Sequence, residues 1–404
     1  MVPNGWEHKA FGEVVKLSKS KYDPKKSTDC FPCIELEHIV QETGQLTGNV
    51  PASNLGSTKN KFKAGDVIFG KLRPYLRKFA QPNFDGVCSS EIWVFSPTKK
   101  IINPYLFQLV QTNQFISEAN KSAGSKMPRA DWGVVSEMIF PLPPLPEQRK
   151  IAKILSTWDN AISTTERLID NSKQQKKALM QQLLTGKKRL LDESGKQFQG
   201  EWKQVHMEEA CFVNPKKSAK PADGLVSFVP MDAVSEDTKL IRHELKRYDE
   251  VSKGFTSFEN QDCLVAKITP CFENGKGAYV DNLHNGIGFG STEFHVLRAR
   301  EGNCTKFIYY ISQTREFRVR GEMNMQGSAG QKRVTTDYLK LFKVNIPPTL
   351  VEQQKVASVL SNADQEIELL ELQLADLKQE KKALMQQLLT GKRRVKINNK
   401  ECVA

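Results

Sequence analysis

Two long segments of the chain carry apolar residues at the spacing of one helical face. In each segment these residues recur at alternating steps of four and three, which is the heptad seam of paired helices. The seam of the first segment consists of Ile151, Leu155, Trp158, Ile162, Ile169, Leu179 and Leu183. The seam of the second consists of Val356, Leu360, Ile367, Leu370, Leu374, Leu377, Leu384 and Leu388. The pattern predicts two long helices that pair through these side chains.

The two segments are copies of one another. The sequence KKALMQQLLTGKKR at residues 176–189 returns 205 positions later as KKALMQQLLTGKRR at residues 381–394, with thirteen of fourteen positions identical. The same offset places Glu147 on Glu352 without a gap. A run this long and this varied does not recur by chance, so we interpret the chain as an internal duplication.

Both predicted helices carry signals at their ends. Thr349 stands three residues before Glu352, which is the spacing of a capping box. Gly186 and Gly391 follow the last apolar positions, where a left-handed backbone closes a helix. Basic residues come after each glycine, at the negative end of the helix dipole.

Each predicted helix needs a partner along its length. About 38 residues at about 1.5 Å each make a rod of roughly 57 Å, which is longer than a single core needs. Thr165 and Ser172 interrupt the first seam, so two copies of the first helix would pair poorly. We therefore predict that the two helices pair with each other in one chain, antiparallel about a pseudo-twofold axis. The alternative is a pair of unrelated surface helices.

The rest of the sequence predicts two mixed, strand-rich domains, so the fold class is α+β with an internal pseudo-twofold repeat. The predicted division is domains at 1–142 and 200–346, helices at 143–190 and 347–395, a linker at 191–199 and a tail at 396–404. In the first domain, turn residues and apolar runs predict strands near 11–16, 33–40, 66–69 and 91–95, and a helix over 106–118.

The two domains resemble each other far less than the two helices do. Lys71 falls on Lys267 at an offset of 196, and Glu91 meets Glu293 at an offset of 202. The shared positions are aromatics, prolines, turn residues and isolated polar residues, without a common set of nucleophiles or ligands. Divergent surfaces on a common frame suit two different recognition tasks.

The charge of the chain favours a polyanionic partner. The formal net charge of +13 indicates nucleic acid first and an acidic membrane surface second. No apolar stretch approaches the roughly 18 residues of a membrane span. The N-terminal sequence also lacks a signal-peptide core, so we expect a cytoplasmic protein.

A basic stretch with one aromatic residue follows a predicted strand in the first domain. Its candidate DNA contacts are Lys71, Arg73, Tyr75, Arg77 and Lys78, a mixture that suits phosphate and groove contacts. At the same place the second domain offers Lys267 and Thr269. The alternative interpretation is a basic surface hairpin.

A glycine-containing loop that ends in arginine is the second candidate in each domain. The first loop offers Lys126 and Arg129, and the second offers Gln331, Lys332 and Arg333. Glycine lets backbone amides approach an anion, and these side chains can reach phosphates or base edges. The alternative is a flexible, solvated loop.

Patterns for catalysis and for metal binding are absent from the sequence. It contains no phosphate-binding glycine motif, no HExxH, no GxSxG and no methyltransferase [DN]-P-P-[YFW] motif. Cys30 and Cys33 have the spacing of half a zinc site, but no second pair completes it. We predict no enzyme activity, no bound metal and reduced thiols for all eight cysteines.

The order of these motifs resembles the specificity subunit of type I restriction-modification systems. A variable domain is followed by PLPPLPEQRKIAKILSTWDNAI and a helix ending in LLTGKKRL, and then by a second variable domain and a second such helix. The resemblance covers essentially the whole chain. It departs locally, because the second helix entry reads Ile-Pro-Pro-Thr-Leu-Val-Glu-Gln and the GKLRPY stretch is not kept in the second half.

The resemblance implies a non-catalytic DNA reader. Each variable domain would be a target recognition domain that reads half of a bipartite, asymmetric site in double-stranded DNA, and the paired helices would set the spacing. Two methyltransferase subunits would dock on this chain, joined by ATP-dependent restriction subunits. The resemblance places S-adenosylmethionine, ATP and Mg on those partners and no cofactor on this chain. The alternatives are a coiled-coil interaction scaffold and a detached half of a self-contained restriction-modification enzyme.

Overall fold

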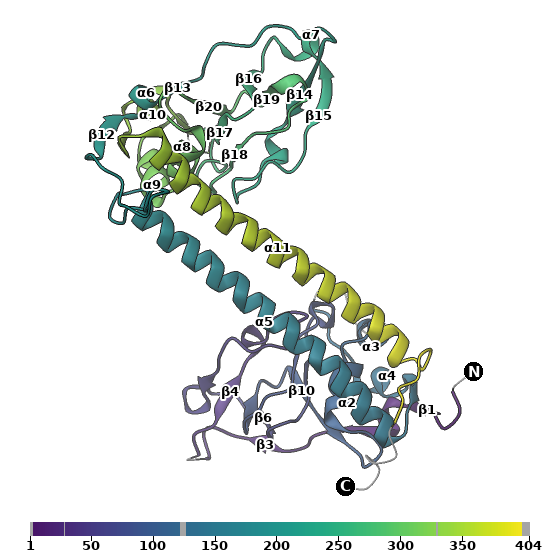
Figure 1. Ribbon diagram of the computed structural model, residues 1–404. Coiled ribbons are helices and arrows are strands. Elements are labelled where there is room, and N and C mark those ends of the chain that lie inside the picture. Colours follow the sequence, from purple (N-terminus) through teal and green to yellow (C-terminus); the bar gives the residue numbers. More distant parts are fainter. Residues whose placement is uncertain (1–2, 28, 122–126, 329, 398–404) are drawn as a thin grey trace. The chain divides into compact units, whose positions relative to one another are not determined.

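A computed structural model of the protein describes residues 3–27, 29–121, 127–328 and 330–397. The chain forms two compact units. Unit 1 comprises Met1–Glu166 and Leu372–Ala404, and unit 2 comprises Arg167–Glu371. The boundaries fall inside two long helices, so each unit contains one strand-rich domain and a part of both helices (Figure 1).

The predicted long helices are α5, Leu145–Leu183, and α11, Leu350–Leu388. The left-handed backbone expected after each helix is present, because Gly186 has φ +70° and Gly391 has φ +73°. At the start of α11, the amide of Glu352 donates to the hydroxyl of Thr349 at 3.3 Å, as an N-cap requires.

The described residues of unit 1 form three sheets. Their orders are β2-β10-β7-β8, β3-β6-β9-β4-β5 and β1-β11. The strands are β1 Glu7–Ala10, β2 Val15–Leu17, β3 Lys21–Tyr22, β4 Pro32–Ile34, β5 Val50–Pro51, β6 Lys59–Phe62, β7 Ile68–Gly70, β8 Phe79–Ala80, β9 Gly86–Cys88, β10 Ile92–Pro97 and β11 Ile139–Leu142. The helices besides α5 and α11 are α1 Phe11–Val14, α2 Asn103–Leu109, α3 Asn113–Lys121 and α4 Trp132–Ser136.

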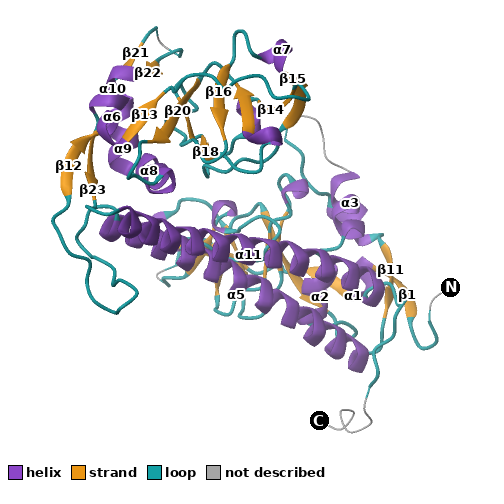
Figure 2. Ribbon diagram, turned by 45° about the horizontal axis from the view of Figure 1, so that its top comes forward, coloured by secondary structure: helices purple, strands orange, loops and turns teal. Residues whose placement is uncertain are grey.

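In unit 2, four sheets are formed by the residues that the structure describes. Their orders are β13-β20-β17-β18, β15-β14-β19-β16, β12-β23 and β21-β22. Figure 2 draws the strands in orange. The strands are β12 Lys203–His206, β13 Cys211–Val213, β14 Leu225–Val229, β15 Glu244–Arg247, β16 Thr256–Glu259, β17 Cys263–Ala266, β18 Gly277–Tyr279, β19 Ile287–Gly290, β20 Phe294–Ala299, β21 Met325–Gln326, β22 Arg333–Val334 and β23 Lys343–Ile346. The helices are α6 Met207–Ala210, α7 Tyr248–Val251, α8 Thr305–Ser312, α9 Arg315–Met323 and α10 Thr336–Leu341.

The two domains share one topology. The antiparallel order β2-β10-β7-β8 in unit 1 recurs as β13-β20-β17-β18 in unit 2. The single parallel pairing in the second sheet also recurs, as β4 with β9 and as β14 with β19. The duplication inferred from the helices therefore extends through the strand-rich domains.

Two predictions about the first domain were wrong in detail. The strand expected at 11–16 is interrupted, because Phe11–Val14 forms one helical turn that buries both end residues and Val15 begins the strand. The helix expected over 106–118 is divided into α2 and α3. At the break, the Thr112 hydroxyl donates to the carbonyl of Leu109 at 2.8 Å and accepts from the amide of Phe115 at 3.2 Å. Thr112 thus caps the new helix.

The strands expected near 66–69 and 91–95 are confirmed as β7 and β10, shifted by one or two residues. The strand expected over 33–40 ends early at Ile34, and Leu36–His38 forms a 3₁₀ turn. The Nδ1 atom of His38 accepts from the amide of Glu35 at 3.0 Å, which closes that turn.

The long helices belong to the cores of the domains. In unit 1 the fully buried Ile151 and Leu155 pack in one cluster with Phe11 and Tyr105. In unit 2 the equivalent Val356 and Leu360 pack in the corresponding cluster with Tyr310. Truncation of such a buried leucine to alanine costs about 2–5 kcal/mol, so the helix ends and the domains stabilise each other.

All fifteen predicted seam residues are buried or half-buried in the helices. Within unit 1, Glu166 of α5 pairs with Lys378 of α11 at 2.8 Å. Within unit 2, Lys173 of α5 pairs with Glu371 of α11, also at 2.8 Å. Unit 1 also pairs Asp159 with Lys381, and unit 2 also pairs Lys176 with Asp364. In each unit the residue numbers fall along one helix as they rise along the other, so the predicted antiparallel pairing is confirmed inside each unit.

Candidate nucleic-acid interface

In unit 1 the structure brings the two predicted basic segments together. The segment that follows β7 runs beside the segment that precedes α4 and forms an isolated bridge between Leu72 and Arg129. The amide of Arg73 donates to the carbonyl of Pro128 at 2.7 Å. The amide of Ala130 donates to the carbonyl of Lys71 at 2.8 Å. The two candidate loops are therefore one structure.

Unit 2 repeats this arrangement with different side chains. An isolated bridge joins Ile268 and Arg333. The amide of Thr269 donates to the carbonyl of Lys332 at 2.9 Å, and the amide of Val334 donates to the carbonyl of Lys267 at 2.8 Å. The backbone that carries the candidate residues is thus common to both halves.

The arginine that ends each glycine-containing loop is held by a glutamate. Nε of Arg129 lies 3.0 Å from the carboxylate of Glu91, and Nη2 of Arg333 lies 2.9 Å from the carboxylate of Glu293. Hydrogen bonding to Arg333 lowers the pKa of Glu293. The same hydrogen bond raises the pKa of Arg333. The sequence comparison aligned Glu91 with Glu293 but did not pair either glutamate with these arginines.

Arg73 and Tyr75 are the exposed candidates of the first loop in unit 1. Arg73 has φ +51° and precedes the 3₁₀ turn Pro74–Leu76, and the ring of Tyr75 is 53% exposed. Within the part of the chain that the structure describes, no hydrogen bond or ion pair holds the side chain of either residue or that of the half-buried Lys71. These side chains can therefore meet a ligand without first leaving a partner.

Arg77 and Lys78 are instead tied to their own domain. Nη1 of Arg77 donates to the carbonyl of Gln111 at 3.2 Å, and its guanidinium also bonds the side chain of Asn113. The ammonium of Lys78 donates to the carbonyl of Leu36 at 2.5 Å. These contacts position the loop rather than leave the charges open to DNA.

In unit 2 the exposed candidate side chains lie on the glycine-containing loop instead. Gln331 and Lys332 are exposed. Thr269 is half-buried, and its hydroxyl donates to Glu273 at 2.8 Å. Lys267 is half-buried as well. The remaining candidate, Lys126 in unit 1, lies outside the described residues.

Sequence reasoning missed the residues that fasten each helix start to the end of the other helix. In unit 1 the buried carboxylate of Glu147 accepts from Nε1 of Trp6 at 3.1 Å and from Nε of Arg394 at 2.8 Å. The available signal was the 205-residue offset, which relates Glu147 to Glu352 and Arg394 to Arg189.

Unit 2 repeats the arrangement. Glu352 accepts from Nε1 of Trp202 at 3.2 Å and from Nε of Arg189 at 2.8 Å. The capping box expected at Glu352 is therefore only half formed, because its carboxylate binds these two side chains and not the backbone of Thr349. The basic residues at the helix ends act as specific ion-pair partners.

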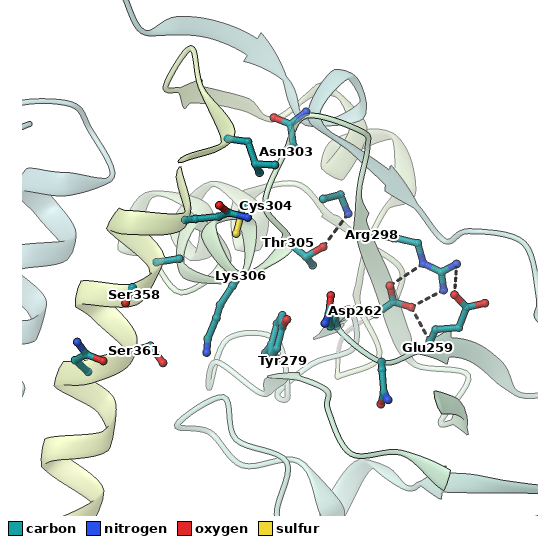
Figure 3. A pocket seen from close by; sticks show the side chains of 17 residues that line it. Glu259, Asp262, Tyr279, Arg298, Asn303, Cys304, Thr305, Lys306, Ser358 and Ser361 are labelled. Atoms are coloured by element: carbon teal, nitrogen blue, oxygen red, sulfur yellow. Dashed lines mark hydrogen bonds and ion pairs between the residues drawn. The ribbon is translucent and has the colours of Figure 1, made fainter. Parts of the chain in front are cut away.

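A polar groove of about 610 Å³ lies in unit 2 beside the first turns of α11 (Figure 3). Its strongest contacts are internal, since Arg298 pairs with Asp262 at 2.7 Å and with Glu259 at 2.8 Å. Ser358, Ser361 and Cys304 contribute hydroxyls and a thiol, but none of the lining residues is a histidine. The groove therefore lacks the usual base for a serine or cysteine nucleophile.

The described residues contain no group of three or more His, Cys, Asp or Glu side chains that could hold a metal ion. Cys30 is exposed while Cys33 is buried. Burial raises the pKa of Cys33 to about 12, which keeps it as a thiol. Among the same described residues, no helix has the length and apolar character that crossing a bilayer requires.

Known proteins match this architecture over both repeats. The family described as "Type I restriction modification DNA specificity domain" matches residues 3–174 and 200–379. The EcoAI specificity subunit of Escherichia coli, a type I restriction enzyme subunit, is 38% identical over 159 residues, which make up 38% of this chain and 26% of that subunit. The chain thus spans about a quarter of the length of that relative.

Two further matches extend over nearly the whole chain. The MjaVIII type I restriction enzyme specificity subunit of Methanocaldococcus jannaschii is 24% identical, with 98% of this chain and 94% of that protein covered. A solved structure concerned with assembly and conformational transition of the type I restriction-modification system contains a chain that is 20% identical, with a TM-score of 0.58. That match covers 97% of this chain and 100% of the other, and at this identity it shows a shared fold.

Proposed function

Because this chain belongs to the family of type I restriction-modification DNA specificity domains, we propose that it is a DNA-reading subunit without catalytic activity of its own. It binds double-stranded DNA in a sequence-specific manner, and each strand-rich domain reads one half of a bipartite, asymmetric site. The observation that carries this proposal is the pair of hydrogen-bonded loops that recurs in both units, which we call the loop frame. It exposes Arg73 and Tyr75 in unit 1 but Gln331 and Lys332 in unit 2.

The contacts divide into two classes. Lysines and arginines on both domains neutralise phosphates and position the protein, and a few loop side chains contact base edges in the major groove. The net charge of +13 supports the first class of contact. Binding should therefore weaken steeply as the salt concentration rises.

The long helices fix the distance between the two half-sites. A helix of 39 residues is roughly 58 Å long, which exceeds one turn of B-DNA at about 34 Å. The two half-sites then lie on one face of the duplex with unread base pairs between them. Support comes from the antiparallel ion pairs in each unit, which hold the two helices in one register.

The helices also dock the catalytic partners of the complex. Two methyltransferase subunits carry S-adenosylmethionine and modify adenine, and ATP-dependent restriction subunits with Mg join them. This part of the proposal rests on the family to which the chain belongs.

Genome-wide mapping of adenine methylation tests the proposed function. The chain is co-expressed with a type I modification subunit from the same genome, and methylated adenines are located by single-molecule sequencing. The expected result is a bipartite motif with a fixed gap that disappears when this chain is omitted. The modification subunit without this chain is the control.

Two results would change the proposal. If an active modification subunit gives no motif together with this chain, the chain is an interaction scaffold and not a reader. A single ungapped motif would mean that only one of the two domains reads DNA.

A further inference from the structure

One glutamate in each unit holds both candidate loops at once. The backbone carbonyl of Glu91 accepts from the amide of Lys71 at 2.9 Å, which ties down the first loop. Its carboxylate binds Arg129, which ties down the second loop. Glu91 stands immediately before β10, a strand whose next four residues are buried, so the anchoring point is rigid.

Glu293 occupies the same place in unit 2. Its carbonyl accepts from the amide of Lys267 at 2.9 Å, and its carboxylate binds Arg333 through both Nε, at 3.0 Å, and Nη2, at 2.9 Å. It stands immediately before β20, which is buried in the same way. Both kinds of contact are thus made by the same type of residue at the same point of the repeated fold.

We call the ion pair of Glu91 with Arg129, and of Glu293 with Arg333, the clamp of its unit. The clamp has the same two residue types in both halves, whereas the loops that it holds differ. Between the two domains of this one chain, the exposed candidate side chains outside the Glu–Arg pair differ, among the described residues, in type and in the loop that carries them. The glutamate and the arginine are the same in both. A pair that read a base would be expected to change with the sequence read, whereas a pair that positions the readers would be kept.

We propose that Glu91 and Glu293 are positioning residues for DNA reading, and that Arg129 and Arg333 serve this clamp instead of contacting a base or a phosphate. The inference rests on the proposed function. It changes the role of Arg129 and Arg333, which the sequence alone suggests as direct DNA contacts. Each clamp acts on the half-site that its own unit reads.

The first test measures both the discrimination between DNA sequences and the dependence of affinity on salt concentration. The full chain is assembled with its modification subunits and titrated with duplexes that carry the mapped motif, or the motif altered in one half-site. Arg129→Gln should lower discrimination at one half-site about threefold to fivefold. It should leave the slope of log affinity against log salt unchanged, whereas loss of a phosphate contact reduces that slope by about 0.9.

The second test compares the two partners of the clamp. Glu91→Gln should reproduce the effect of Arg129→Gln, and the double variant should be no worse than either single one. The reversed pair, Glu91→Arg with Arg129→Glu, should recover discrimination. In unit 2, Glu293→Gln and Arg333→Gln should impair the other half-site only.

Glu118→Gln is the matched control, because it breaks the exposed ion pair between Lys121 and Glu118 in the same domain. Thermal unfolding of every variant shows whether it is folded. The proposal is overturned if Arg129→Gln reduces the salt slope, or if Glu91→Gln behaves like Glu118→Gln. Absence of any sequence preference in the wild-type complex would instead overturn the proposed function.

Discussion

The ammonium group of Lys381 lies 2.5 Å from the carboxylate of Asp159, which joins α11 to α5 inside unit 1. Lys381 is buried and also donates to the side-chain oxygen of Gln111 at 2.8 Å. Asp159 in turn accepts from Gln108 at 2.8 Å. This cluster joins both long helices to the neighbouring helix of the domain.

The same relationship is found in unit 2. Lys176 lies 2.5 Å from Asp364, and it also donates to Gln313 at 3.3 Å. Asp364 accepts from the hydroxyl of Tyr310 at 2.8 Å. A buried polar pair in a seam of apolar residues fixes the register of paired helices, because any shift leaves charges without partners.

Replacement of the buried lysine should therefore destabilise unit 1. Lys381→Met removes one partner, leaves Asp159 partly buried without a counter-charge and should lower the free energy of unfolding by about 1–3 kcal/mol. Urea unfolding followed by circular dichroism measures this change. Lys382→Met is the control, since Lys382 is exposed on the same helix. Equal stability of both variants would show that the pair contributes nothing.

The register of the helices should also determine the gap in the DNA site. Seven residues inserted into α5 between Asp159 and Lys176 lengthen this helix by about 10.5 Å. The ion pairs of Asp159 with Lys381 and of Lys176 with Asp364 can then no longer form at the same time. A matched insertion in α11 between Asp364 and Lys381 restores both pairs. The matched variant should read a gap longer by about three base pairs, at about 3.4 Å each.

Methylation mapping in cells gives the motif of each insertion variant. The variant with one insertion should be unstable or lose methylation. If the matched variant methylates the original gap, the helices do not set the spacing.

The sequence predicted most where its signal was periodic or repeated. A heptad pattern and a constant offset were enough to identify the seam from Ile151 to Leu183 and its copy. The length of both helices and their antiparallel pairing could therefore be predicted. Short strands of two to four residues carry too little periodicity, and the segment that begins at Phe11 is helical because tertiary packing buries Phe11 and Val14.

Side-chain roles were harder to predict because their partners are distant in the chain. Glu91 and Arg129 are 38 residues apart in sequence, and Glu147 and Arg394 are 247 apart. No local pattern connects such residues. Positive charge likewise could not distinguish Arg73, whose side chain is exposed and not held by another described residue, from Lys78, whose ammonium binds a backbone carbonyl.

The buried His295 should make the stability of unit 2 depend on pH. Burial lowers the pKa of His295 from 6.5, and nearby Lys267 adds to this effect while Glu293 and a hydrogen bond to the Val334 carbonyl oppose it. The unfolded chain therefore takes up this proton at a higher pH than the folded protein. Stability is complete above pH 6.5 and falls as the pH drops below that value.

His295→Gln removes the titration and keeps an amide that can bond the Val334 carbonyl. Relative to this variant, the wild type should lose stability progressively between pH 6.5 and pH 5. Thermal unfolding at closely spaced pH values measures the difference. His8→Gln, at an exposed position in unit 1, is the control and should follow the wild type. A constant difference between wild type and His295→Gln over this range would contradict the prediction.

The contrast between Arg73 and Lys78 gives a direct test of which charges meet DNA. Arg73→Ala removes an exposed guanidinium that no other described side chain holds, so affinity should fall and the salt slope should decrease by about one. Lys78→Ala removes an ammonium that already donates to the carbonyl of Leu36 and should leave the slope unchanged.

Fluorescence anisotropy with a labelled duplex at several salt concentrations measures both slopes. If Arg73 contacts a phosphate, its removal should weaken binding to every sequence equally. If it contacts a base edge, the loss should be confined to one position of one half-site. Identical slopes for Arg73→Ala, Lys78→Ala and the wild type would exclude Arg73 as a phosphate contact.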